Sequence, residues 1–168
     1  MKDKAPNSIK DFLKPRAGNI KQGYFKPAFP EKYIGDLSKV IFRSSWEFKF
    51  LKWCDHNPNV IKYASEPIGI KFYNPLDKRV HVYYVDFYII IKDSAGNEQK
   101  FLIEVKPLKY VNPPVAPKIM TNNHMANYIW ASKQFIINRA KFEAAKAFAD
   151  QRGVKFGVIT ENFLFKSI

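Results

Sequence analysis

The stretch VHVYYVDFYIIIKDSAGNEQKFLIEVK, residues 80–106, decides the fold of this chain. Its two halves are rich in β-branched and aromatic residues, which favour strands. The turn-forming residues Asp93-Ser94-Ala95-Gly96-Asn97 separate the halves, and two such runs around a short turn are typical of an antiparallel hairpin. The stretch therefore predicts strands over residues 80–92 and 99–105 that pair with each other.

Charged residues interrupt both apolar runs. Asp86 stands among apolar and aromatic neighbours. Because burying an unpartnered carboxylate costs roughly several kcal/mol, a cation or strong donors are expected beside it. A structural salt bridge to a lysine is the simplest such partner. Glu104 and Lys106 end the second run and, two residues apart, share one strand face, although alternating charge at a strand end usually marks only the solvent side.

The hairpin brings the two acids together. A turn near Ala95 pairs positions whose numbers sum to about 190, which places Asp86 opposite Glu104. Opposed carboxylates, with Cβ atoms about 4.5–5.5 Å apart, repel each other unless a cation lies between them. Mg²⁺ is typically held by one or two carboxylates with water and phosphate oxygens, so we expect Mg²⁺, with Mn²⁺ as a substitute, on Asp86, Glu104 and the carbonyl of Val105. Lys106 would orient the attacking water or counter charge in a phosphorane-like transition state.

The net charge points to an anionic partner. The chain has 28 Lys and Arg against 15 Asp and Glu, a formal charge of +13 and a sequence pI near 9.7. A pI above about 9 is typical of nucleic-acid-binding domains, although an anionic membrane or an acidic protein could use the same charge. No motif indicates direct base readout, so phosphate contacts should dominate. The basic residues that follow the acids are expected to form a phosphate-binding rim: Lys109, Lys118, Lys133, Arg139 and Lys141.

The rest of the sequence predicts a mixed α/β (α+β) fold. Apolar residues at helical spacing after Ser44 favour a helix that ends by Asn57-Pro58, and Gly153 is a plausible stop for a later helix. The expected elements are strands at residues 60–63, 68–73 and 154–160, with a long helix at 122–151. The last strand follows a helix and could lie parallel in the sheet. The sum is a central mixed sheet flanked by helices.

The chain is expected to form one domain behind a basic N-terminal arm. At 168 residues with 46% apolar composition it can build one core. Residues 1–35 are basic and contain prolines, which favours either a strap along phosphates or a solvated terminus, and residues 36–168 form the single domain. No long apolar run or signal sequence occurs, so a soluble intracellular protein with no membrane role is expected. Cys54 and the few histidines show no zinc-ligand spacing.

The acidic motif resembles that of the PD-(D/E)XK nuclease superfamily. Its two parts are Val85-Asp86-Phe87 and Leu102-Ile103-Glu104-Val105-Lys106, with Val85 in place of the usual proline. Further segments resemble the TnsA-type branch and are similar to the head-completion nucleases of T-even-like tailed phages. These segments are Ser45-Trp46-Glu47-Phe48, Cys54-Asp55-His56-Asn57-Pro58, Ser65-Glu66-Pro67, Tyr84-Val85-Asp86-Phe87 and Val158-Ile159-Thr160-Glu161. The resemblance covers roughly residues 40–161.

The resemblance implies a restriction-endonuclease-like core and a metal-dependent DNA endonuclease. It also implies a further acid on the first helix, which matches Glu47. That glutamate equally fits a capping box with Ser44, yet it shares a stripe with Leu51 that leans toward the sheet. Accessory polar residues often occur on the helix after the acid-x-Lys strand, which points to Asn138 and Lys141, one turn apart.

The phage resemblance implies trimming or repair of packaged DNA ends during head maturation, in the host cytoplasm or in the virion, with the portal or neck as a docking partner. Two other functions remain open. One is a virion structural or DNA-end-binding protein that keeps the nuclease fold without cleavage. The other is the nuclease subunit of a transposition complex, which would need a transposase and often a second DNA-binding domain. The sequence sets no oligomeric state.

Overall fold

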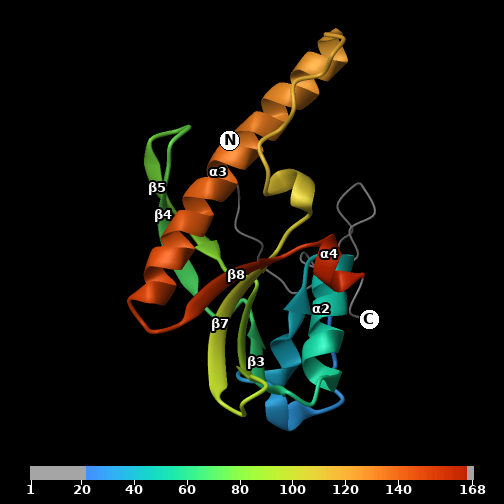
Figure 1. The fold of residues 1–168 in the computed structure, drawn as a ribbon, viewed down its shortest axis with the longest axis vertical. Coiled ribbons are helices and arrows are strands. Elements are labelled where there is room, and N and C mark those ends of the chain that lie inside the picture. Colours follow the sequence, from blue (N-terminus) through green and yellow to red (C-terminus); the bar gives the residue numbers. More distant parts are fainter. Residues whose placement is uncertain (1–21, 166–168) are drawn as a thin grey trace.

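A computed structural model describes residues 22–165 of the chain (Figure 1). Strands and helices alternate irregularly along it. The strands are β1 (Gly23–Tyr24), β2 (Ile41–Phe42), β3 (Val60–Ser65), β4 (Gly69–Asn74), β5 (Arg79–Tyr84), β6 (Phe87–Lys92), β7 (Glu98–Val105) and β8 (Lys155–Ile159). The helices are α2 (Ser45–His56), α3 (Asn122–Asp150) and α4 (Glu161–Leu164), with the short 3-10 turns η1 (Pro30–Lys32), η2 (Leu37–Lys39) and η3 (Leu108–Tyr110).

A four-stranded mixed sheet with the order β3-β6-β7-β8 forms the centre. The β6 and β7 strands form the predicted antiparallel hairpin, and its register pairs Phe87 with Ile103 and Ile91 with Gln99, as expected for a turn near Ala95. β8 runs parallel to β7, so the prediction for the last strand is also confirmed. The mixed α/β architecture predicted from the sequence is therefore correct.

The prediction of one continuous strand over residues 80–92 is wrong. β5 pairs with β4 in a separate two-stranded hairpin, whereas β6 belongs to the central sheet. The chain changes sheets at residues 85 and 86, where the Val85 amide donates to the Ile68 carbonyl (3.3 Å) and the Asp86 carbonyl accepts from the Glu66 amide (2.8 Å). The strand breaks because this backbone bonds to the connection between β3 and β4 instead of to a neighbouring strand.

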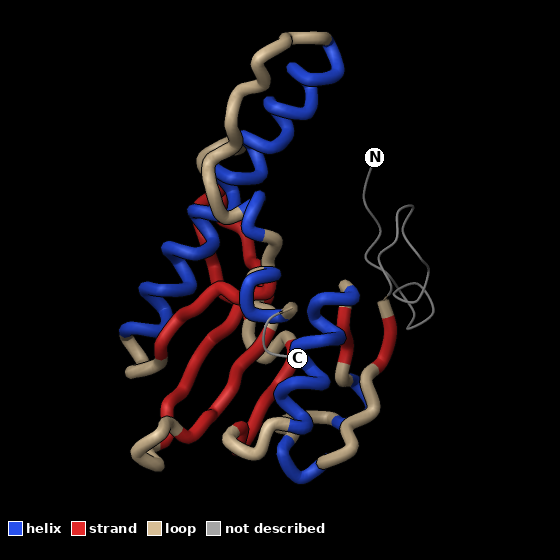
Figure 2. The backbone as a smooth tube through the Cα atoms, turned by 45° about the vertical axis from the view of Figure 1, so that its right-hand side comes forward, coloured by secondary structure: helices blue, strands red, loops and turns tan. Residues whose placement is uncertain are grey.

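Two cores lie on opposite faces of the central sheet. On one face, buried residues of α2 and α4 such as Phe50 and Leu164 pack against Ile103 of β7. On the other, Ala145 of α3 and residues of the β4–β5 hairpin pack against Leu102. Figures 1 and 2 show α2 and α4 on one side of the sheet and α3 with the β4–β5 hairpin on the other. Because side chains alternate along a strand, Glu104 faces the side of α3, as Leu102 does.

The long helix α3 extends well beyond the sheet, with the preceding loop alongside it (Figure 2). The hydroxyl of Thr121 caps its start by accepting from the His124 amide (3.2 Å). Beyond its end, Gly153 adopts a φ of +64°, which other residues rarely take. We call residues 111–136 the α3 extension. No helix within residues 22–165 is long and apolar enough to cross a membrane.

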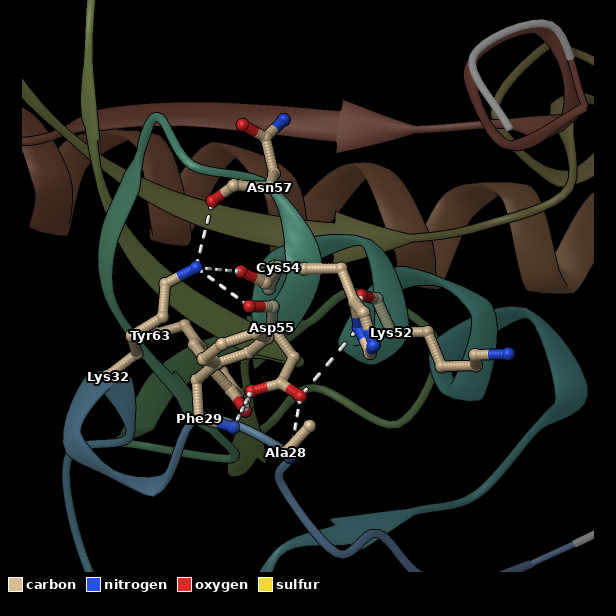
Figure 3. Close-up of polar contacts among 9 residues, drawn as sticks. Ala28, Phe29, Lys32, Lys52, Cys54, Asp55, Asn57 and Tyr63 are labelled. Atoms are coloured by element: carbon tan, nitrogen blue, oxygen red, sulfur yellow. Dashed lines mark hydrogen bonds and ion pairs between the residues drawn. The ribbon is translucent and has the colours of Figure 1, made fainter.

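Part of the predicted N-terminal arm packs onto the domain. Residues 1–21 lie outside the described residues, but Phe25 is buried in the core. The fully buried carboxylate of Asp55 accepts from the amides of Ala28 (2.7 Å) and Phe29 (3.2 Å), while the Lys32 ammonium donates to carbonyl oxygens at the end of α2 (Figure 3). The segment that contacts the core therefore begins before residue 36.

Candidate active site

The β6–β7 hairpin, with β8 paired to β7, brings Asp86, Glu104 and Lys106 together. Asp86 follows the sheet change at the start of β6, and its Oδ2 accepts a hydrogen bond from the Val105 amide on β7 (2.7 Å). Glu104 is 4% exposed on β7, and its Oε1 lies 2.9 Å from the Nζ of Lys106. The Lys106 amide is bonded to the Ile159 carbonyl of β8 (2.9 Å), so the end of β7 stays extended and the lysine remains beside the acid.

Burial and mutual repulsion oppose ionisation of Asp86. Burial raises the pKa of this carboxyl well above its ordinary value, and the negative charges of Glu104 and Glu47 raise it further. For Lys106, burial alone would lower the pKa, but the charges of Glu104 and Asp86 outweigh it and the pKa is raised. In this arrangement Lys106 is therefore an ammonium at neutral pH, which suits a charge-stabilising role better than that of a general base.

Glu47 sits at the N-terminus of α2 and makes the predicted capping box. Its amide donates to the Ser44 hydroxyl (3.1 Å), which in turn donates to Glu47 Oε1 (2.9 Å), and its Oε2 accepts from the Arg43 amide (2.7 Å). Burial raises the pKa of Glu47, with added repulsion from Glu66 and Glu104. The glutamate thus caps the helix and also contributes negative charge to the site, and its role as a metal ligand stays a prediction.

An ion pair that sequence reasoning did not single out lies next to these acids. The Arg43 guanidinium donates through Nε and Nη2 to the two carboxylate oxygens of Glu66. The negative charges of Glu66, Glu47 and Asp86 all favour the charged form of Arg43, whose pKa is raised. Glu66 adopts a φ of +44°, an uncommon conformation for a residue with a side chain. In the sequence, Glu66 stood out only as part of Ser65-Glu66-Pro67, one of the segments that resemble the TnsA-type branch.

The carboxylates of Asp86 and Glu104 suit a divalent cation that also binds the substrate. Glu104 Oε2 is buried and has no hydrogen-bond partner, and such an atom is commonly satisfied by an ion or water. Among residues 22–165, no group of three or more His, Cys, Asp or Glu could hold a metal ion by protein ligands alone. Asp86 and Glu104 therefore suit a cation that also takes water and phosphate oxygens, as Mg²⁺ typically does.

The predicted rim residues occupy different environments. Lys109 is exposed after β7, with its ammonium 4.8 Å from the Tyr110 ring centroid, and Lys118 and Lys133 are exposed on the α3 extension. Arg139 pairs with Glu143 on the surface of α3 (3.1 Å). Asn138 is 6% exposed and donates to the Tyr110 carbonyl (3.3 Å), so it fastens η3 to α3. Their contacts with DNA stay predictions.

Lys141 of α3 is close enough to the acids to feel their charge. Its ammonium lies 5.7 Å from the ring centroids of both Phe72 and Tyr83. Burial lowers the pKa of Lys141, the positive charge of Lys106 lowers it further, and Glu104 and Asp86 act in the opposite direction. Sequence reasoning included Lys141 but missed Tyr83, which lies in the middle of an aromatic strand and has no distinguishing sequence signal.

Comparisons with known proteins agree with this geometry. Residues 57–161 match the family model described as TnsA-like endonuclease N terminal. The chain belongs to the TnsA-like endonuclease family. It is also 35% identical over 142 residues to the protein named head completion nuclease of Enterobacteria phage T4, and the match covers 84% of this chain and 92% of that protein. No solved structure matches the chain.

Membership of the TnsA-like family confirms the resemblance inferred from the sequence motifs. The mixed sheet flanked by helices is the architecture expected for a restriction-endonuclease-like nuclease. TnsA-like and related nucleases generally use divalent metal ions, in keeping with the unpartnered oxygen of Glu104. The matched segment contains Asp86, Glu104 and Lys106 and begins after Glu47.

Proposed function

We propose that this TnsA-like endonuclease hydrolyses DNA phosphodiester bonds with Mg²⁺, for which Mn²⁺ can substitute. The observation that carries the proposal is the buried pair of acids: Asp86 is held by the Val105 amide (2.7 Å) and Glu104 keeps one oxygen unpartnered beside Lys106. Repelling carboxylates with a free oxygen need a cation. An ammonium next to them supplies positive charge where an anionic transition state forms.

Each residue has a distinct role in the proposed chemistry. Asp86 and Glu104 hold the metal, with the Val105 carbonyl as an added ligand and Glu47 as an auxiliary one. When bound, the metal lowers the pKa of a water molecule and neutralises charge on the phosphate. Lys106 positions the attacking water and stabilises negative charge on the phosphoryl oxygens. Lys106 pairs with Oε1 of Glu104 (2.9 Å) and leaves Oε2 without a partner, so the metal would take Oε2 while the lysine stays beside it.

The biological setting of the proposal comes from the T4 relative, whose name is head completion nuclease. By analogy, this chain trims or repairs packaged DNA ends in the infected host, and portal or neck proteins are the proposed docking partners. DNA is the proposed substrate, with little base specificity. A non-catalytic DNA-end-binding role is the alternative, but it leaves the free oxygen of Glu104 without a purpose.

The test is cleavage of supercoiled and linear duplex DNA by the purified protein with Mg²⁺, Mn²⁺ or EDTA. The variants Asp86→Asn and Glu104→Gln keep side-chain shape but remove the charges that hold the metal. We expect each to lose about a hundredfold or more of the rate, the scale expected for removing one charge-stabilising group from an active site. Glu98→Gln is the matched control, because Glu98 is an exposed glutamate at the opposite end of the same strand.

Metal-dependent nicking that disappears in both site variants and survives in Glu98→Gln supports the proposed function. Cleavage that persists in EDTA, or that both site variants retain, contradicts it. Binding to DNA ends without cleavage in any metal favours the structural role instead.

A further inference from the structure

Two buried side-chain polar atoms in the described part of the chain lack a hydrogen-bond partner, and both lie on the α3 side of the sheet. They are Glu104 Oε2 and the hydroxyl of Tyr83. Buried polar groups are nearly always bonded, so each exception needs an explanation such as a catalytic role or a missing ligand. Tyr83 packs in the same core cluster as Leu102, two residues from Glu104, and the charge of Glu104 acts on its hydroxyl. One missing ligand would account for both unpartnered atoms.

Tyr83 belongs to the β4–β5 hairpin, which packs against the α3 side of the sheet. It lies on β5, three residues before Asp86, and is 7% exposed. Its hydroxyl is close enough to Glu104 and Asp86 that their charges add to burial in raising its pKa. Its ring packs edge-on against Phe72 of β4 (5.8 Å between centroids). A phenylalanine would fill the same space, so packing alone does not account for the hydroxyl.

Lys141 of α3 lies next to the Tyr83 ring. Its ammonium lies 5.7 Å from the Tyr83 ring centroid, and no hydrogen bond or ion pair of Lys141 occurs among residues 22–165. Glu104 and Asp86 act on Lys141 electrostatically, as they do on Tyr83. A half-buried ammonium and a buried hydroxyl are thus influenced by the charges of two acids and bond to neither.

We propose that the Tyr83 hydroxyl and the Lys141 ammonium together bind an oxygen of the scissile phosphodiester, on the α3 side of Asp86 and Glu104. This inference rests on the proposed nuclease function and adds a second pair of residues to it. A hydroxyl and an ammonium are donors, so the partner that they lack is an anionic oxygen. A cation held by the acids would attract the same phosphate, so the metal and this donor pair act on one group.

The first test is Tyr83→Phe, which removes one oxygen and keeps the ring. We expect the cleavage rate on plasmid DNA with Mg²⁺ to fall about tenfold to a hundredfold, as for loss of a hydrogen bond to a charged group. Thermal stability should stay the same or rise, because the variant no longer buries an unpaired hydroxyl. Tyr88→Phe is the matched control: Tyr88 lies on β6, and its hydroxyl is influenced by Glu98 at the far end of the hairpin.

The second test is Lys141→Gln, compared with Lys155→Gln. Lys155 also lies 5.7 Å from an aromatic ring centroid, that of Phe101, but Phe101 packs against the core on the α2 side of the sheet. We expect Lys141→Gln to slow cleavage about tenfold to a hundredfold and Lys155→Gln to leave it near wild type. If both donors contact one phosphate, the double variant with Tyr83→Phe loses less than the product of the single effects.

A binding measurement separates this inference from the nuclease proposal. Without divalent metal, fluorescence anisotropy of a duplex oligonucleotide should show weaker binding for Tyr83→Phe and Lys141→Gln than for the two controls. If wild type cleaves DNA but both variants bind and cleave like their controls, the donor pair is wrong and the nuclease proposal stands. If wild type cleaves nothing yet the variants bind DNA less tightly, the pair contacts phosphate and the nuclease proposal is wrong.

Discussion

The fold opposes the ionisation of Asp86, although the proposed chemistry needs its carboxylate. Burial comes first among the causes that raise its pKa, and repulsion by Glu104 and Glu47 follows. A folded-state pKa above the unfolded value means that the charged form destabilises the native state at neutral pH. Functional sites often carry such a cost, which is a stability–activity trade-off.

Replacement of Asp86 by Asn should therefore stabilise the metal-free protein while abolishing cleavage. Asn keeps an oxygen to accept from the Val105 amide. We expect the Tm at pH 7 to rise by a few degrees, and the gain to shrink as the pH falls and to vanish below the ordinary Asp pKa of 3.8. Differential scanning calorimetry from pH 3.5 to 7 in EDTA measures this. A lower Tm at pH 7, or a gain that does not depend on pH, would contradict the prediction.

Some residues of the candidate site could be predicted from the sequence and others could not. Asp86 and Glu104 stand out because they are charged within apolar runs, and the hairpin arithmetic pairs them. Tyr83 does not stand out, because a tyrosine among aromatic strand residues looks like core and only the three-dimensional structure shows that its hydroxyl has no partner. Glu66 was hidden for another reason: its ion pair with Arg43 joins two loops far apart in sequence.

At the scale of elements, Asp55 joins α2 to the segment that precedes it. Its carboxylate accepts from the Ala28 and Phe29 amides and from the Tyr63 hydroxyl (3.0 Å). Asp55→Ala leaves these donors unpaired in the interior, so we expect the free energy of unfolding to fall by about 3 kcal/mol. Urea denaturation followed by tryptophan fluorescence measures the loss.

Asp150→Ala is the control for Asp55, because Asp150 is exposed and, within residues 22–165, its carboxylate pairs with Lys146 alone on the surface of α3. It should change the unfolding free energy by no more than about 0.5 kcal/mol. Equal losses in the two variants would mean that the Asp55 hydrogen bonds do not hold the segment. Faster proteolysis near residue 28 in Asp55→Ala alone would locate the released segment.

The elements themselves were largely predictable, and the exception has a physical cause. Periodicity and turn residues located α2, α3 and β8 within a few residues. The division of residues 80–92 into β5 and β6 was missed because neither Gly nor Pro occurs at residues 85 and 86, and Asp86, a poor strand residue, was interpreted only as a functional acid. The break depends on hydrogen bonds from the distant connection between β3 and β4, which a local pattern cannot contain. The predicted register between β6 and β7 is still correct, because the turn near Ala95 sets it.

At the scale of the molecule, the positive charge is unevenly spread along the chain. No acid occurs between Glu104 and Glu143, and this stretch includes the α3 extension, which projects from the body of the protein (Figure 1). The extension also exposes apolar side chains, including Val115 and Ile119. The only charged residues of the extension are Lys118 and Lys133, both exposed and with no acid in the extension to pair with, so they are the candidates for phosphate contacts there.

This distribution predicts which lysines set the salt dependence of DNA binding. Each phosphate contact contributes about −0.9 to the slope of log K against log salt concentration. Neutralising Lys118 and Lys133 together should therefore make the slope less steep by about 2, with a similar loss of affinity for every duplex sequence. Anisotropy titrations of one duplex at several KCl concentrations give the slope.

The matched control neutralises Lys92 and Lys100, which lie in the half of the β6–β7 hairpin next to its turn. The α3 extension projects at the other end of the molecule (Figure 1). Both pairs of substitutions lower the net charge equally, so a general effect of the protein's field would change the two slopes alike. A change confined to Lys118 and Lys133 places the DNA along the α3 extension. Equal changes would instead mean that the +13 charge attracts DNA without a defined track, and the phosphate contacts would then have to come from residues at the acids, Lys141 among them.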